Sequence, residues 1–65
     1  MNNLAEIMKR KKITAVELSR KTGLQPETIR RLIRNSNATP NNHTACELSK
    51  ALGYTVAQIR GEKEI

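Results

Sequence analysis

Residues 14–34 read TAVELSRKTGLQPETIRRLIR, a segment in which one helix ends and another begins within a few residues. Thr14 and Glu17 form a capping-box pattern, in which each side chain bonds a backbone N–H left unpaired at a helix start. Gly23 can adopt the left-handed conformation that ends a helix without a clash at Cβ. Pro26 suits the first turn of a helix. The segment therefore predicts two helices that meet at a steep angle across a short turn.

The same kinds of signal predict helices along the rest of the chain, with a loop in the Asn-rich segment around Pro40. Gly53 is expected to end one helix, and Thr55 to cap a short one after it. Beyond Gly61 the chain is polar, and we expect a frayed tail over residues 61–65. The expected helices cover about residues 3–11, 14–22, 26–35, 42–52 and 56–60.

The composition favours a small all-α protein. A chain of 65 residues has room for one domain, over residues 1–65, and a domain of this size has marginal stability. With one Tyr and no Phe or Trp, the core must be built from aliphatic residues. Cys46 is the single cysteine, so no internal disulfide is expected, and Cys46 with His43 is too small a ligand set for a metal. These features predict a cytoplasmic protein with no metal, cofactor or membrane span.

Charge points to a polyanionic partner. Twelve Lys and Arg oppose six Asp and Glu, which leaves a net charge of +6. This balance fits nucleic acid best, although a membrane-surface or ribosomal protein is also basic. The positions of the charges must therefore decide between these classes.

The helix expected over residues 26–35 has two distinct faces at 100° per residue. Its apolar face consists of Ile29, Leu32 and Ile33. Its charged face consists of Glu27, Arg30, Arg31 and Arg34. A solvated outer face is the ordinary explanation for such charges. The use of arginine without lysine favours DNA instead, because the guanidinium fork matches guanine O6/N7 or a phosphate with two hydrogen bonds.

Over nearly its whole length, the chain resembles a known family, the helix-turn-helix domain of phage Cro proteins and lambda-type repressors. The residues that carry the resemblance are Leu18, Gly23, Leu24, Ile29 and Leu32, followed by Pro40, Leu48, Ala51, Leu52, Gly53 and Thr55. The resemblance implies a compact five-helix domain with its helix-turn-helix at about 14–34. Such domains usually act as dimers on operators of two-fold symmetry.

The resemblance also implies positions for DNA contacts. Thr14 and Ala15 would meet a phosphate, and Arg34 would lie near the groove wall. The residues that would face base edges are Gln25, Pro26, Glu27, Arg30 and Arg31.

Several departures from the family, and the position of Glu27, bear on these contacts and on the interior. Gln25 is a poor N-cap, so its side chain is expected to be free for adenine, and Pro26 offers only apolar contact, as to a thymine methyl. Glu27 has two open roles: to hold the fork of Arg30 or Arg31, or to accept a hydrogen bond from cytosine N4. Ser19 and Thr22 replace apolar residues, which predicts a more polar interior.

Further phosphate contacts are expected outside the helix-turn-helix. Lys12 ends a basic run, although such runs are often only solvated helix ends. In the loop, Asn35, Asn37 and Asn41, with neighbouring polar residues, have side-chain amides that can bind phosphate, although asparagine is also common in turns. Tyr54 is expected to pack in the core rather than stack on a base.

The sequence analysis therefore predicts a small phage or bacterial transcription regulator that binds a palindromic operator in double-stranded DNA. It would act as a homodimer that represses by occlusion, with the exposed side of residues 56–60 as the candidate dimer interface. No catalytic residues or small-molecule substrate are expected. The alternatives are an antitoxin, a protein-interaction module or an RNA binder on the same fold. Sequence-reading RNA modules usually stack bases on exposed aromatic residues, which are scarce here.

Overall fold

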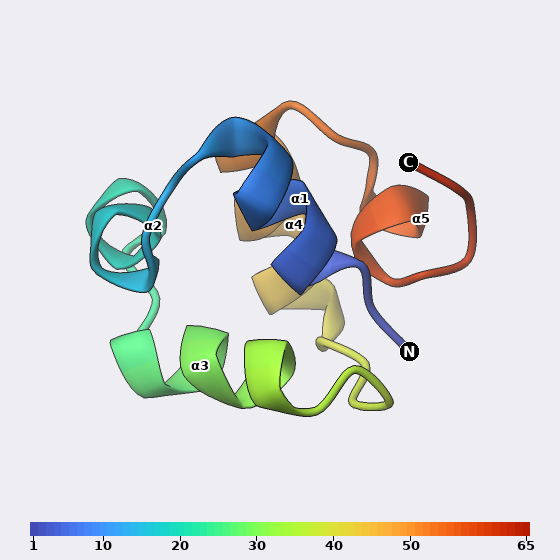
Figure 1. The fold of residues 1–65 in the computed structure, drawn as a ribbon, viewed down its shortest axis with the longest axis horizontal. Helices are drawn as coiled ribbons and strands as arrows, with labels where there is room; N and C mark the ends of the chain where they lie inside the picture. The colour runs from blue at the N-terminus through green and yellow to red at the C-terminus, as the bar shows by residue number, and fades with distance from the viewer.

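The computed structural model describes residues 1–65, which form five α-helices and no strands (Figure 1). The helices are α1 (Leu4–Lys11), α2 (Ala15–Thr22), α3 (Pro26–Arg34), α4 (Asn42–Leu52) and α5 (Val56–Ile59). Each end lies within one residue of the predicted one. The predicted all-α, five-helix fold is therefore confirmed. None of these helices has both the length and the apolar composition needed to span a lipid bilayer.

The helix ends follow the local signals. Glu17 N donates to Thr14 Oγ1 at 3.2 Å and Thr14 N donates to Glu17 Oε1 at 3.1 Å, so the predicted capping box is formed. Gly23 ends α2 in the left-handed region, with φ of 77°. Lys12 ends α1 with φ of 54° and is the one residue other than glycine with a positive φ. The basic run at residues 9–12 predicted this end of the helix but not its left-handed conformation, because lysine is not a residue that favours it.

The core is formed by apolar side chains from all five helices. It contains Leu4, Ile7, Met8, Leu18, Ile29, Leu32, Ala45, Leu48, Leu52 and Ile59. Burying a Leu or Ile side chain contributes about 1.5–3 kcal/mol, so this cluster is the main source of stability. Helix α3 packs against α2 and α1, whereas α4 packs against α2 and α5. Consequently α3 runs along one edge of the molecule, with one face on the core and the other turned outward (Figure 1).

The polar residues on the inner side of α2 build the turn that leads into α3. Ser19 Oγ donates to Leu24 O at 2.6 Å. Thr22 Oγ1 donates to Leu18 O at 2.8 Å and accepts from Leu24 N at 3.1 Å. Both side chains are half-buried beside a core cluster whose members are all apolar. Their hydrogen bonds offset the cost of burying these groups.

The turn after α4 repeats this construction. Ser49 lies four residues before Gly53, as Ser19 lies four residues before Gly23, and Ser49 Oγ donates to Tyr54 O. The Tyr54 ring is half-buried against the core, as predicted, and the Nζ of Lys11 lies 5.7 Å from its centroid.

The expectation of a frayed tail after Gly61 is wrong. Gly61 takes φ of 78°, which turns the chain back towards α5. Glu62 N then donates to Ala57 O at 2.8 Å, and Asn3 Nδ2 donates to Lys63 O at 3.1 Å. Ile65 packs against the core. The folded-back segment covers part of the surface of residues 56–60, which was the predicted dimer interface. No residue from 56 to 60 is fully exposed.

Candidate nucleic-acid interface

The two faces of α3 are arranged as its periodicity predicts. Ile29 is fully buried and Leu32 is buried, while Ile33 is half-buried against the core. All four charged residues of the helix, namely Glu27, Arg30, Arg31 and Arg34, are exposed. The helix therefore presents its charged side to solvent from a rigidly packed base.

The first turn of α3 leaves the Gln25 side chain free. Gln25 is the N-cap residue with an extended backbone, and its side chain makes no capping hydrogen bond, as predicted. Pro26 occupies the first turn, where its missing N–H costs nothing. Gln25 is exposed and Pro26 is half-buried. An amide and an apolar ring thus precede the charged face.

Glu27 pairs with Arg34, not with Arg30 or Arg31 as the sequence analysis expected. Glu27 Oε1 lies 2.6 Å from Arg34 Nη2. A step of seven residues along a helix, at about 100° each, is only about 20° short of two full turns. The two side chains therefore point the same way, and they are long enough to meet. Their side chains are 68% and 67% exposed. Arg30 and Arg31 consequently have no acidic partner within the chain.

Three other residues that were predicted to contact phosphate lie at the end of α1 and the start of α2. Thr14 is exposed, and its hydroxyl oxygen caps α2 by accepting from Glu17 N. Ala15 is half-buried, and Lys12 is exposed. Lys12 lines a hollow of about 240 Å³ that also includes Lys21 and residues of α4. The structure therefore groups Lys12 with α2 and α4, not with the face of α3.

An acidic group also lies at the start of α2. The pKa of Glu17 is lowered below its ordinary value of 4.5, chiefly because its carboxylate accepts the hydrogen bond from Thr14 N, with a further contribution from the Thr14 hydroxyl. Glu17 is thus ionised near neutral pH, beside the predicted phosphate contact of Thr14.

A second hollow, of about 350 Å³, joins α3 to the loop and the start of α4. Its lining consists of Thr28, Arg31, Leu32, Ala38, Thr39, Pro40, Asn41 and Thr44. The structure therefore brings a base-contact candidate, Arg31, together with a phosphate-contact candidate, Asn41. The sequence, in which these residues are ten positions apart, gave no indication of this cavity.

The loop asparagines use their oxygens internally and leave their amide groups free. Asn35 Oδ1 accepts from Asn37 N at 3.1 Å, and Asn41 Oδ1 accepts from Thr44 N at 2.8 Å. Neither Nδ2 has a partner in the protein, and the Asn37 side chain makes no hydrogen bond. Free N–H₂ groups complement phosphate oxygens, which only accept hydrogen bonds.

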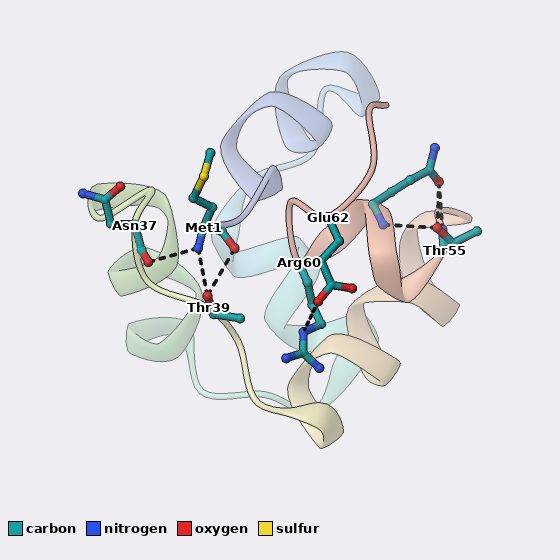
Figure 2. A network of polar contacts seen from close by, with 7 residues as sticks. Met1, Asn37, Thr39, Thr55, Arg60 and Glu62 are labelled. Carbon is teal, nitrogen blue, oxygen red and sulfur yellow. Dashed lines mark hydrogen bonds and ion pairs between the residues drawn. The ribbon is translucent and has the colours of Figure 1, made fainter.

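The start of the chain holds this loop, a role that the sequence analysis missed. The Met1 amino group donates to Asn37 O at 3.1 Å and to Thr39 Oγ1 at 2.8 Å (Figure 2). Asn2 is buried, with 8% exposure, and also bonds this segment. An Asn-Asn pair before a helix indicates a local cap at most, so these distant partners had no signal in the sequence.

Comparison with known protein families gives a match over most of the chain. The family model of the Cro/C1-type HTH DNA-binding domain matches residues 3–61, a range that includes all five helices. No curated protein and no solved structure matches the chain.

Proposed function

Because the chain belongs to the family of Cro/C1-type HTH DNA-binding domains, we propose that it is a sequence-specific transcription regulator that inserts α3 into the major groove of duplex DNA. It binds a palindromic operator as a homodimer and represses transcription by occluding the site. A net charge of +6 supports strong attraction to the DNA backbone.

One observation carries this proposal: Arg30 and Arg31 are exposed and unpaired on a helix whose opposite face is anchored in the core. Each guanidinium can bond O6 and N7 of a guanine together. Gln25 at the start of α3 can bond adenine N6 and N7 in the same groove, and Pro26 can contact a thymine methyl. Glu27 faces the same groove but is held by Arg34.

The phosphate contacts proposed around this helix fix its register on the duplex. They comprise Lys12, Thr14, Ala15, Arg34, Asn35, Asn37 and Asn41. The free Nδ2 groups of Asn35 and Asn41 support the loop contacts, as does the hollow beside Arg31 at the N-terminal end of α4. Helix N-termini favour phosphate because their N–H groups and dipole point towards it.

The dimensions of the protein are compatible with a dimer on adjacent major grooves. The backbone measures 25 × 21 × 20 Å. Two such protomers side by side have room to hold their α3 helices about 34–36 Å apart, the spacing of one DNA turn. A bound dimer would cover the operator and exclude other proteins from it.

The experiment that tests this function is selection of bound duplexes from a random DNA pool. We expect enrichment of a short palindrome, with two chains per site at saturation. Binding should weaken about a thousandfold between 50 and 200 mM salt, as about six Lys and Arg contacts to phosphate in a dimer would require. Without enrichment the proposal is wrong, and retention by a protein partner would then favour an antitoxin or interaction module.

Substitutions in α3 test the base contacts. Arg30→Ala or Arg31→Ala should weaken binding to the selected site by about 1–3 kcal/mol and relax preference at one base position. Lys12→Ala is the control, and it should weaken binding to all sequences about equally. If folded variants at both arginines keep the parent's affinity and base preference, α3 does not read the major groove.

A further inference from the structure

The C-terminal end of helix α3 differs from those of α2 and α4. Helices α2 and α4 each end at a left-handed glycine, whereas α3 ends at Asn35 with φ of −121° and ψ of 91°. The last four carbonyls of a helix lack partners inside it and must find them elsewhere. The carbonyl of Leu32, in the last turn of α3, therefore depends on a donor from another part of the chain.

Asn2 supplies that donor from the opposite end of the sequence. Its Nδ2 donates to Leu32 O at 3.2 Å, to Asn35 O at 3.3 Å and to Ala38 O at 2.7 Å. Its backbone N–H donates to Ser36 O at 2.9 Å. One buried side chain thus ties the end of α3 to the first residues of the loop.

The other end of the same side chain fixes Asn2 to α1. Its Oδ1 accepts from Leu4 N at 3.0 Å, within the first turn of that helix. Asn2 is only 8% exposed, so an amide that lost its partners would be buried without compensation. Asn2 therefore holds the segment after α3 in a fixed position relative to α1.

We propose that Asn2 is a positioning residue for DNA binding: it touches no DNA but holds the segment from Leu32 to Ala38 so that Asn35 and Asn37 meet the phosphate backbone. The inference rests on the proposed function of α3 and its loop. Without the Asn2 bonds, residues 35–38 would have to be ordered at the moment of binding, at a cost in conformational entropy.

The adjacent Asn3 provides a matched control. Its Nδ2 donates to Gln58 O at 2.8 Å and to Lys63 O at 3.1 Å, so it ties α1 to α5 and the tail. The two asparagines have the same chemistry and neighbouring positions but hold opposite parts of the molecule. A general loss of stability should follow from either substitution, whereas a loss of phosphate contacts should follow only from the change at Asn2.

The test uses the full chain without an N-terminal extension, because Met1 also bonds the loop. Asn2→Ala and Asn3→Ala are compared for thermal unfolding and for affinity to a selected duplex and a scrambled duplex between 50 and 200 mM salt. Asn2→Ser is a milder variant, since a serine oxygen can still accept from Leu4 N but is too short to reach all three carbonyls. Exchange of the Ala38 amide reports directly on the loop.

For folded Asn2 variants we expect weaker binding to both duplexes by a similar factor, with a log–log salt slope close to that of the parent, because the lost contacts belong to neutral amides and only Lys and Arg contacts release counterions. Ala38 exchange should be faster, while Asn3→Ala should leave both the affinity for DNA and this exchange unchanged. Equal affinity of the parent and a folded Asn2 variant for both duplexes would overturn the positioning role while leaving the proposed function intact. If the parent bound no duplex at all, the proposed function itself would fail, and the positioning role with it.

Discussion

Glu27→Gln distinguishes two roles for the single acidic residue of α3, namely restraint of Arg34, with which the structure pairs it, and reading of a cytosine. In the structure its carboxylate lies 2.6 Å from Arg34 Nη2. If Glu27 restrains Arg34, the substitution removes the ion pair and releases an arginine at the groove wall. If Glu27 reads cytosine N4, the same substitution exchanges a charged acceptor for a weaker neutral one at one base position.

The magnitudes follow from the exposure of the pair. Both side chains are about two-thirds exposed, so water screens the interaction and its loss should change the free energy of unfolding by less than about 1 kcal/mol. On DNA, removal of the Glu27 carboxylate leaves the charge of Arg34 uncompensated, so its phosphate contact counts fully in counterion release and steepens the log–log salt dependence by up to about 0.9 per protomer. Between 50 and 200 mM salt this adds up to about a 3.5-fold loss of affinity per protomer. At low salt, affinity for every sequence should rise because a negative charge has been removed.

Fluorescence anisotropy over this salt range, on the selected and a scrambled duplex, measures both quantities. Arg34→Ala and the double variant complete a thermodynamic cycle, in which the steeper slope should disappear once Arg34 is absent. Two results would refute the reasoning. One is a loss of about 1–3 kcal/mol confined to one C·G position, which would assign Glu27 to base reading. The other is a slope change that persists without Arg34.

Three further predictions concern the scaffold and are measured by denaturant unfolding. The lowered pKa of Glu17 contributes stability that is fully present above pH 4.5 and is lost as pH falls through the folded pKa below that value. Glu17→Gln keeps the capping box but should flatten this part of the pH profile, and an unchanged profile would contradict it. Lys12→Gly should stabilise the protein by about 0.5–1 kcal/mol, because it relieves the left-handed φ of 54°, whereas a destabilised variant would argue against strain there. Ser19→Ala should cost about 1–2 kcal/mol by leaving the Leu24 carbonyl unpaired, with Ser49→Ala as its counterpart after α4, and a neutral result at both sites would remove the proposed role of these turns.

Much of the fold and of the candidate interface could be predicted because the signals are local. The capping box of Thr14 and Glu17 lies within four residues, and the left-handed Gly23 ends α2 by its own conformational freedom. The periodicity of α3 likewise separates Ile29 from Arg30 and Arg31, since side-chain direction in a helix depends only on position. These features require no knowledge of how the helices pack.

Local sequence signals did not predict which side chains form pairs, because such pairs depend on side-chain geometry. Glu27 has arginines at three, four and seven residues along α3, and charge alone favours none of them. The structure selects Arg34 because it shares nearly the same direction from the helix axis. Similarly, Gly61 was expected to begin a frayed tail, yet its left-handed turn returns the chain to Ala57.

The sequence by itself determined where each helix begins and ends and which face of α3 is buried, because those properties arise from contacts within one or two turns. The tertiary structure alone decided what holds the interface in place. Asn2 lies 36 residues from Ala38, and their hydrogen bond exists only because packing brings α1 against the end of α3. A buried amide must find partners wherever the fold places them, and no pattern of neighbouring residues specifies a partner so distant.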